Sequence, residues 1–141
     1  LNIPKIKEYL SYLNYHPEEI KLISQDFLIN VTYFFRDKAA FEVVQHAVIP
    51  AIMKDKTHGD IVKAWSVGCS SGEEAYSLAI LFQEYIEKKK LFDLNIKIFA
   101  TDIDRDALDK ASKGIYPKSA MREMNEQRLA RFFTPEGDQY K

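Results

Sequence analysis

The sequence is short of cysteine, of long apolar runs and of any excess of one charge. Cys69 is the only cysteine among 141 residues, which excludes an internal disulfide and is typical of a reducing, cytoplasmic compartment. The longest run without a polar or charged side chain, AVIPAIM at residues 47–53, is far below the ~20 residues of a membrane span. Twenty basic residues against 21 acidic ones argue against non-specific nucleic-acid binding. We therefore expect a cytoplasmic protein without membrane insertion and without a nucleic-acid partner.

The first part of the sequence predicts helices and one extended segment. Residues 1–24 predict two short helices, with Pro17 at the first turn of the second. Residues 26–37, DFLINVTYFFRD, are rich in β-branched and aromatic side chains, which favours a strand or an extended segment. Residues 37–54 predict a helix that Asp37 caps and that Pro50 kinks or ends.

After residue 60 the sequence alternates strands and helices. Strands are predicted over 61–67 and 95–100, and helices over 73–90, 105–113 (stopped by Gly114) and 125–133. This order is typical of a parallel α/β sheet with right-handed crossovers. Such sheets normally have about five or six strands, so we expect only the first half of an α/β domain, in a chain that begins at Leu1 rather than Met. The charged linker 54–60 divides a helical part, residues 1–56, from the α/β part, residues 57–141.

A small-residue loop, VGCSSGEEAYSLAI, turns the first strand into a helix. Gly68 and Gly72 would let the backbone turn tightly and approach a ligand at the carboxyl end of the strand. Neither the dinucleotide fingerprint nor the phosphate-loop signature is met, and Glu73 and Glu74 already occupy the positive end of the helix. A ligand there would carry positive charge rather than phosphate. Ser71 and Glu74 also fit a capping box, which is an equally supported and compatible interpretation.

Two aspartates follow the second strand in IFATDID. Asp104 stands where a helix cap belongs, before RDALDKA. We assign Asp102 to a ribose, because a carboxylate at the tip of the second strand accepts two hydrogen bonds from a diol. S-adenosylmethionine has the ribose and the positive charge that these residues call for, and it has no phosphate.

Four motifs carry a family resemblance: NVTYFFRD, WSVGCSSGEEAYSLAI, IFATDID, and the L-x-x-A-x-x-G-x-Y spacing that begins at Leu108. In this order they resemble the CheR-type chemotaxis-receptor glutamate methyltransferases, from about residue 20 to the end of the chain. Ala75 departs from the commoner GEEPYS and is similar to the branch in which a methylesterase is fused to the methyltransferase. The family's later Arg-Asn-x-x-x-Tyr-Phe stretch and its receptor-docking β-subdomain do not occur in this sequence.

The resemblance implies a Rossmann-like class I methyltransferase fold, here incomplete, after part of an all-helical N-terminal domain. It implies methyl transfer from S-adenosylmethionine, leaving S-adenosylhomocysteine, to glutamates on the cytoplasmic domains of membrane chemoreceptors. Glu74 would hold the amino group of the cofactor, and Asp102 its ribose. The cofactor-binding residues expected by motif are Asn30, Thr32, Arg36, Gly68, Ser70, Glu74, Asp102 and Ile103.

Methyl transfer to a glutamate requires neither a general base nor a general acid from the protein. An acceptor glutamate is already ionised near neutral pH, and a neutral thioether leaves, so positioning dominates. Arg36 is the candidate catalytic residue, either keeping the acceptor ionised or orienting it. His16, His46 and His58 show no metal-ligand spacing, and no metal is expected.

Two other functions remain open at this level. An NAD-dependent oxidoreductase would share the strand–loop–helix pattern, although the missing glycines and the acidic helix start argue against it. A non-catalytic binding module would share the fold, although Glu74, Asp102 and Arg36 are retained. Exposed sheet edges of an incomplete domain could also pair between copies and form an oligomer.

Overall fold

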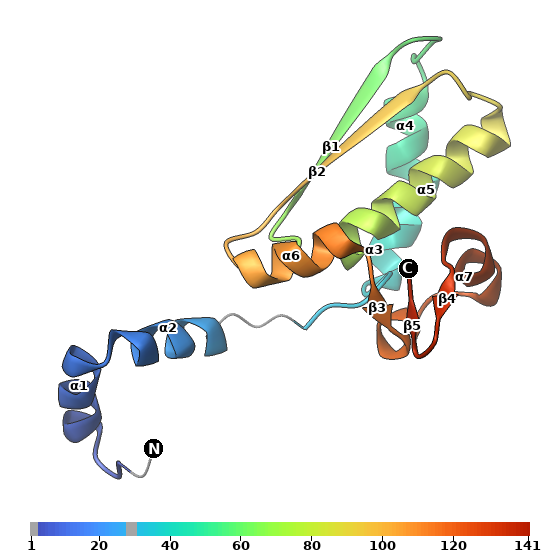
Figure 1. Ribbon diagram of the computed structural model, residues 1–141. Helices are drawn as coiled ribbons and strands as arrows, with labels where there is room; N and C mark the ends of the chain where they lie inside the picture. The colour runs from blue at the N-terminus through green and yellow to red at the C-terminus, as the bar shows by residue number, and fades with distance from the viewer. Residues whose placement is uncertain (1–2, 28–30) are drawn as a thin grey trace. The chain divides into compact units, whose positions relative to one another are not determined.

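The computed structural model describes residues 3–27 and 31–141 (Figure 1). It divides into two compact units, Leu1–Asn30 and Val31–Lys141, which are treated separately here. The domain boundary predicted after residue 56 falls inside the second unit, and as a division of the protein it stays a prediction. No helix in the two described stretches has the length and apolar character needed to span a membrane.

The first unit consists of two short helices that follow each other directly. Helix α1 covers Ile6–Tyr15 and helix α2 covers Pro17–Asp26, so both predicted helices are confirmed, with Pro17 at the first position of α2. The Tyr9 hydroxyl donates to the Glu19 carboxylate at 2.9 Å, and the rings of Tyr12 and His16 stack with centroids 3.8 Å apart. No residue of α1 is buried, so polar and ring contacts hold these helices together more than a core does.

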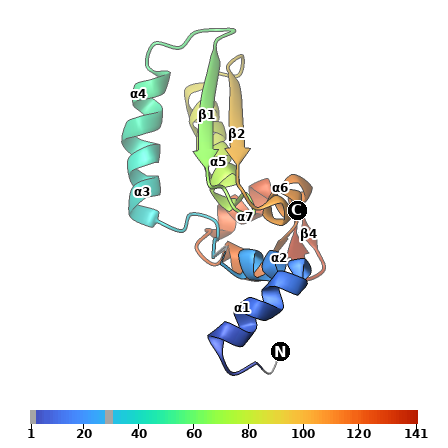
Figure 2. The ribbon, with the colours of Figure 1, turned by 90° about the vertical axis from the view of Figure 1, so that its left-hand side faces the viewer.

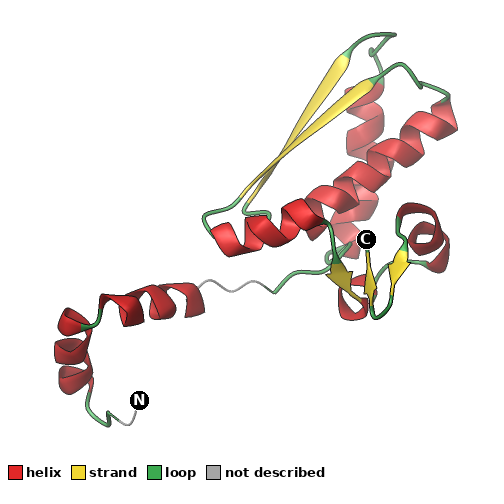
Figure 3. Cartoon of the chain, viewed as in Figure 1, coloured by secondary structure: helices red, strands yellow, loops and turns green. Residues whose placement is uncertain are grey.

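The second unit is built around two parallel strands. Strand β1, Ile61–Val67, pairs with β2, Asn95–Thr101, from Ile61 opposite Asn95 to Val67 opposite Thr101. Helix α5, Glu73–Lys89, is the crossover between them and lies against one face of the pair (Figures 1 and 3). The predicted strands, crossover helix and mixed α/β class are therefore confirmed.

Alternation along the strands decides which side chains are buried. Val62, Ala64 and Ser66 of β1 face α5, while the side chains between them point to the opposite face. On that face Trp65 and Phe99 are exposed, and the Trp65 indole N–H donates to the Thr101 hydroxyl at 2.9 Å. The core thus lies on the helical side of the sheet.

A broken helix precedes β1 and packs against α5. It consists of α3 (Lys38–Val43), the π-helical turn η1 (Val44–Val48) and α4 (Ile49–Met53), one continuous rod in Figure 2. The Asp37 carboxylate accepts from the Ala40 amide, which confirms the predicted cap. Pro50 lies in the first turn of α4, and because it lacks an N–H, the helical ladder widens to a π-turn just before it.

The C-terminal part adds short elements that the sequence pattern did not predict. Helix α6 (Arg105–Lys113) ends at Gly114, as expected, and α7 covers Glu126–Phe132. Between and after them lie β3 (Tyr116–Pro117), the 3₁₀ turn η2 (Lys118–Met121), β4 (Pro135–Glu136) and β5 (Gln139–Tyr140). These strands form a small antiparallel sheet in the order β3-β5-β4. Two-residue strands have no periodicity to read.

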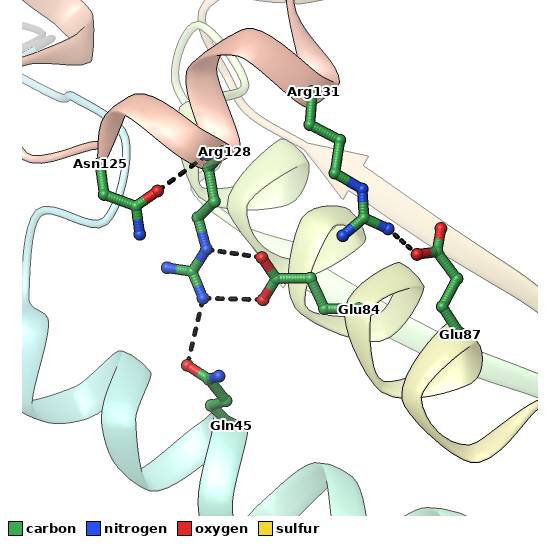
Figure 4. A network of polar contacts seen from close by, with 6 residues as sticks. All are labelled: Gln45, Glu84, Glu87, Asn125, Arg128 and Arg131. Carbon is green, nitrogen blue, oxygen red and sulfur yellow. Dashed lines mark hydrogen bonds and ion pairs between the residues drawn. The ribbon is translucent and has the colours of Figure 1, made fainter.

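Two ion pairs join α7 to α5 (Figure 4). The Arg128 guanidinium binds both oxygens of Glu84 at 2.8 Å and also donates to Gln45 of η1 at 3.2 Å. Arg131 pairs with Glu87 one turn further along both helices. The Arg128 group also lies over the Phe35 ring, 4.6 Å from its centroid. Arg128 therefore links three elements of the second unit.

No strand forms in the described part of residues 26–37, for which a strand or an extended segment is predicted. Helix α2 extends to Asp26, and residues 31–35 are irregular and end in a turn; residues 28–30 lie outside the described part of the chain. Phe34 and Phe35 are both buried, which a strand with one solvent face does not allow. Phe35 also has a φ of +54°, a conformation foreign to strands. Tertiary burial of two adjacent aromatic rings overrides the local propensity.

Candidate functional site

The loop after β1 is fastened to the end of β2. The amides of Gly68 and Cys69 both donate to the Thr101 carbonyl, at 2.8 and 3.0 Å. Gly68 has a φ of +71°, and a side chain placed there would meet no atom within 4 Å. The glycine is therefore required by its left-handed backbone, and its Cα faces open space where a ligand could approach.

Gly72 has a different role from the one predicted. Its φ is +95°, and a Cβ there would lie 2.8 Å from Ala111 Cβ and 3.1 Å from the Tyr116 hydroxyl oxygen. The same Tyr116 hydroxyl donates to the Ser71 carbonyl at 2.8 Å. Gly72 thus allows the loop to pack closely on α6 and β3, and approaches protein rather than a ligand.

Asp102 holds the two loops together. Its Oδ2 accepts from the Ser70 amide at 2.7 Å, and its Oδ1 accepts from the Asp104 amide at 2.8 Å. Asp104 accepts from the amides of Asp106 and Ala107, which confirms the predicted cap of α6. Each carboxylate oxygen of the half-buried Asp102 has a second lone pair, so it can still accept from a diol.

Two serine hydroxyls hold the two glutamates that begin α5. The Ser66 hydroxyl lies 2.7 Å from Glu74 Oε1, and the Ser71 hydroxyl lies 3.0 and 2.8 Å from the two oxygens of Glu73. Glu73 is turned inward and is 4% exposed, whereas Glu74 is exposed. Identical neighbours in the sequence therefore have opposite surroundings.

The predicted capping box of Ser71 and Glu74 is wrong. Gly72, not Ser71, occupies the N-cap position of α5, and no side chain caps that end. The helix begins one residue later than the box requires, so Ser71 reaches the Glu73 carboxylate instead of a backbone amide. Glu74 is consequently free of any capping duty.

The electrostatics of this end of the sheet are negative. Burial raises the pKa of the Cys69 thiol, and the nearby charges of Asp102, Glu74 and Glu73 raise it further. Burial likewise raises the pKa of Tyr116 well above its usual range, with Glu73 adding to the shift. Within residues 3–27 and 31–141 no basic side chain forms an ion pair with any of these three carboxylates. The negative charge of these carboxylates would therefore attract a cationic ligand.

The segment before α3 is anchored to the first turn of α5. The Phe35 amide donates to the Ser77 hydroxyl at 3.1 Å, and Ser77 in turn donates to the Glu73 carbonyl at 2.7 Å. The Phe34 ring packs edge-on against the Tyr116 ring, with centroids 4.9 Å apart. A backbone held at φ +54° by buried partners is a strained feature, and such strain gathers at functional sites.

The remaining predicted site residues are less closely connected. Thr32 is half-buried, Ile103 is 85% exposed, and Arg36 is exposed with its guanidinium donating to the Val31 carbonyl. Asn30 lies outside the described residues. The structure brings together Gly68, Ser70, Glu74 and Asp102, and in its described part no hydrogen bond or ion pair joins Thr32, Arg36 or Ile103 to them.

Three residues shape this site although they were not predicted as site residues: Ser66, Ser77 and Tyr116. Ser66 and Ser77 are buried polar residues on faces that are otherwise apolar. A serine at an inward position of a strand or helix requires a hydrogen-bond partner, and that requirement was the available signal. Tyr116 is the last residue of the L-x-x-A-x-x-G-x-Y spacing, but that spacing does not predict its hydrogen bond to the loop, which depends on how α6 returns to it.

Comparison with known proteins places this chain among methyltransferases. Residues 30–141 match the family model described as CheR methyltransferase, SAM binding domain. A chemotaxis protein methyltransferase of Borreliella burgdorferi is 35% identical over 115 residues, which cover 79% of this chain and 40% of the relative. The corresponding protein of Listeria innocua is 33% identical over 141 residues, covering 96% of this chain and 51% of the relative.

One longer relative is also similar. An uncharacterized 104.1 kDa protein of Rhodobacter capsulatus is 33% identical over 138 residues, which are 98% of this chain and 14% of that protein. The chain thus spans about half, or less, of the length of these curated relatives.

Proposed function

Since the chain belongs to the CheR methyltransferase family, we propose that it supplies the cofactor-binding part of an enzyme that methylates glutamate side chains. Its cofactor is S-adenosylmethionine. The observation that carries the proposal is the convergence of Glu74 and Asp102 at the carboxyl ends of two parallel strands.

The residues at this edge fit the cofactor chemically. Glu74 offers an exposed carboxylate to an ammonium, and Asp102 keeps acceptor capacity for ribose hydroxyls. Gly68 leaves open space beside the backbone. The absence of an ion-paired cation within the described residues favours a ligand that brings its own positive charge. When bound, S-adenosylmethionine supplies a methyl group on a positively charged sulfur.

The protein's contribution would be orientation rather than acid–base chemistry. The acceptor glutamate is ionised near neutral pH, so no residue of this chain has to remove a proton. Well-aligned reactants gain up to roughly 7–11 kcal/mol from positioning. The strained turn at Phe35, fixed through Ser77 to α5, would hold Thr32 and Arg36 at a defined place relative to the loop.

The wider assignment follows from the named relatives. We propose that the substrate is the cytoplasmic part of membrane chemoreceptors and that the enzyme acts in the cytoplasm during chemotaxis signalling. The two parallel strands would be the start of a Rossmann-like class I methyltransferase sheet. Pairing between copies through exposed strand edges stays a prediction, which sedimentation of a clean monomer would contradict.

Ligand titration tests the cofactor site directly. Calorimetry of the full-length protein with S-adenosylhomocysteine and, separately, with NAD compares the two ligand classes that strand–loop–helix sites accept. We expect saturable binding of S-adenosylhomocysteine alone. Binding of NAD without S-adenosylhomocysteine would return the site to the oxidoreductase class.

Arg36 tests the catalytic half of the proposal. Because its guanidinium is exposed and held by the Val31 carbonyl, it is available to an acceptor carboxylate. We expect Arg36→Ala in the full-length enzyme to lower receptor methylation by at least roughly tenfold while S-adenosylhomocysteine affinity changes less. Unchanged turnover at saturating cofactor and receptor would remove Arg36 from the reaction.

A further inference from the structure

The two glutamates that begin α5 accept hydrogen bonds from two serines in different parts of the chain, and their surroundings differ. Ser71, in the loop, holds Glu73 through both oxygens, and Glu73 is 4% exposed. Ser66, at an inward position of β1, bonds only Oε1 of Glu74, whose side chain reaches solvent. Both oxygens of Glu73 are therefore bonded within the fold, whereas Glu74 is exposed and accepts at one oxygen only among the described residues.

We propose that Ser66 is a positioning residue, whose hydroxyl fixes the Glu74 carboxylate in the orientation that receives the amino group of an adenosyl amino-acid ligand. The inference rests on the proposed function and deepens it. It makes the Ser66–Glu74 pair the element that distinguishes ligands with an amino-acid moiety from those that carry adenosine alone.

Packing does not account for a hydroxyl at this position. Ser66 is 2% exposed and follows Val62 and Ala64 on the face of β1 that packs against α5. Its partner in the strand register is Ala100. A buried hydroxyl costs free energy unless it is bonded, and alanine would fill the same space without that requirement. The bond to Glu74 is what the hydroxyl adds.

Glu74 needs such a partner to act as a well-defined ligand. A glutamate side chain loses on the order of 1–2 kcal/mol of rotamer entropy when it is fixed. The Ser66 bond, at 2.7 Å, limits that freedom before any ligand arrives. A carboxylate that is already oriented binds a cation more tightly, because less ordering accompanies binding.

The inference predicts a split between two probes. S-adenosylhomocysteine carries the amino-acid moiety, whereas methylthioadenosine has the adenosine but no amino group. We expect Ser66→Ala in the full-length protein to weaken S-adenosylhomocysteine about tenfold by calorimetry, and to leave methylthioadenosine within about twofold. Unchanged S-adenosylhomocysteine affinity, or an equal loss for both probes, would overturn the positioning role.

Companion variants separate the possible failures. Ser66→Thr keeps the hydroxyl and should restore most of the affinity, and Ser112→Ala on α6, an exposed serine, should change neither probe. If Ser66 acts through Glu74, then Ser66→Ala should add less than about twofold in a Glu74→Gln background. If the losses of affinity from Ser66→Ala and Glu74→Gln were fully additive, the positioning role of Ser66 would be overturned while the proposed function would stand. Unchanged affinity in Glu74→Gln itself would overturn the assignment of Glu74 in the proposed function.

Discussion

The two ends of α5 hold their glutamates in opposite ways. Toward its C-terminus Glu84 and Glu87 are neutralised by Arg128 and Arg131 of α7 (Figure 4). At its N-terminus Glu73 and Glu74 accept only from serine hydroxyls among the described residues. Hydroxyls orient a carboxylate without cancelling its charge.

That difference separates structural from functional charge within one helix. A carboxylate paired with a fixed guanidinium has little left to offer a ligand, and removing one partner mainly harms the fold. An exposed carboxylate held by one hydroxyl, such as Glu74, still attracts a cation, so its removal mainly harms binding. The helix dipole favours an acidic residue at the N-terminal end whether that residue serves the fold, as Glu73 does, or a ligand, as proposed for Glu74. The dipole therefore cannot distinguish these two roles.

Breaking the Arg128–Glu84 pair is the sharpest test of the structural end. The side chains are 19% and 22% exposed, and the bond is bidentate. We expect Arg128→Met to lower the free energy of unfolding by about 2–3 kcal/mol in urea titrations, since Glu84 loses its partner. The affinity for S-adenosylhomocysteine should stay within about threefold.

Arg131→Met is the matched control on the same helix. Its pair with Glu87 is about twice as exposed, so the loss should be at most about 0.5–1 kcal/mol. Replacing both partners, Arg128→Met with Glu84→Met, should recover part of the stability. Equal losses for Arg128→Met and Arg131→Met would show that burial does not distinguish these pairs.

The functional end is tested by Glu74→Ala. We expect S-adenosylhomocysteine affinity to fall about 30-fold, or about 2 kcal/mol, because a charge-assisted bond to the ligand is lost. The free energy of unfolding should fall by about 1 kcal/mol, because the buried Ser66 hydroxyl loses its acceptor. Glu87→Ala, another glutamate of α5, is the control, and calorimetry should show no change of affinity. Undiminished affinity in Glu74→Ala would show that the N-terminal end of α5 does not bind the ligand through Glu74, and the contrast between the two ends would be wrong.

A smaller effect is expected where the site meets its anchored segment. Ser77→Ala removes the acceptor of the buried Phe35 amide, which should lower the free energy of unfolding by about 1–2 kcal/mol. Ser112→Ala, an exposed serine, should cost less than about 0.5 kcal/mol. An unchanged free energy of unfolding in Ser77→Ala would mean that packing alone maintains the strained turn at Phe35.

The sequence predicted the parts of the molecule in which local pattern and tertiary structure agree. β1, α5, β2 and α6 have strong periodicity and clear boundaries, and Asp104 and Gly114 mark the ends of α6. Parallel pairing then placed the loop and Asp102 at one edge of the sheet. These inferences needed no knowledge of side-chain contacts.

The errors occur where contacts distant in sequence decide the structure. Phe35 has strand propensity, yet its amide is captured by Ser77, 42 positions further along the chain. The capping box failed because Gly72 begins α5 and sends Ser71 to Glu73. Ser66 looked like an ordinary strand residue, and only the structure revealed that its hydroxyl meets Glu74. A motif fixes residue types, whereas hydrogen-bond partners depend on the assembled fold.

The smallest predicted effect is on the pKa of the Cys69 thiol, which depends on the carboxylate charges near the N-terminal end of α5. Burial and then the charge of Asp102 hold the pKa of Cys69 above its ordinary value. The folded state therefore favours the neutral thiol: its contribution to stability is complete below about pH 8.5 and is lost as pH rises through the folded pKa. Thiolate absorbance against pH, with Cys69→Ser as the blank, should give a midpoint above that of the unfolded chain. Asp102→Asn should move the midpoint down, and an unmoved midpoint would mean that the charge of Asp102 does not raise this pKa.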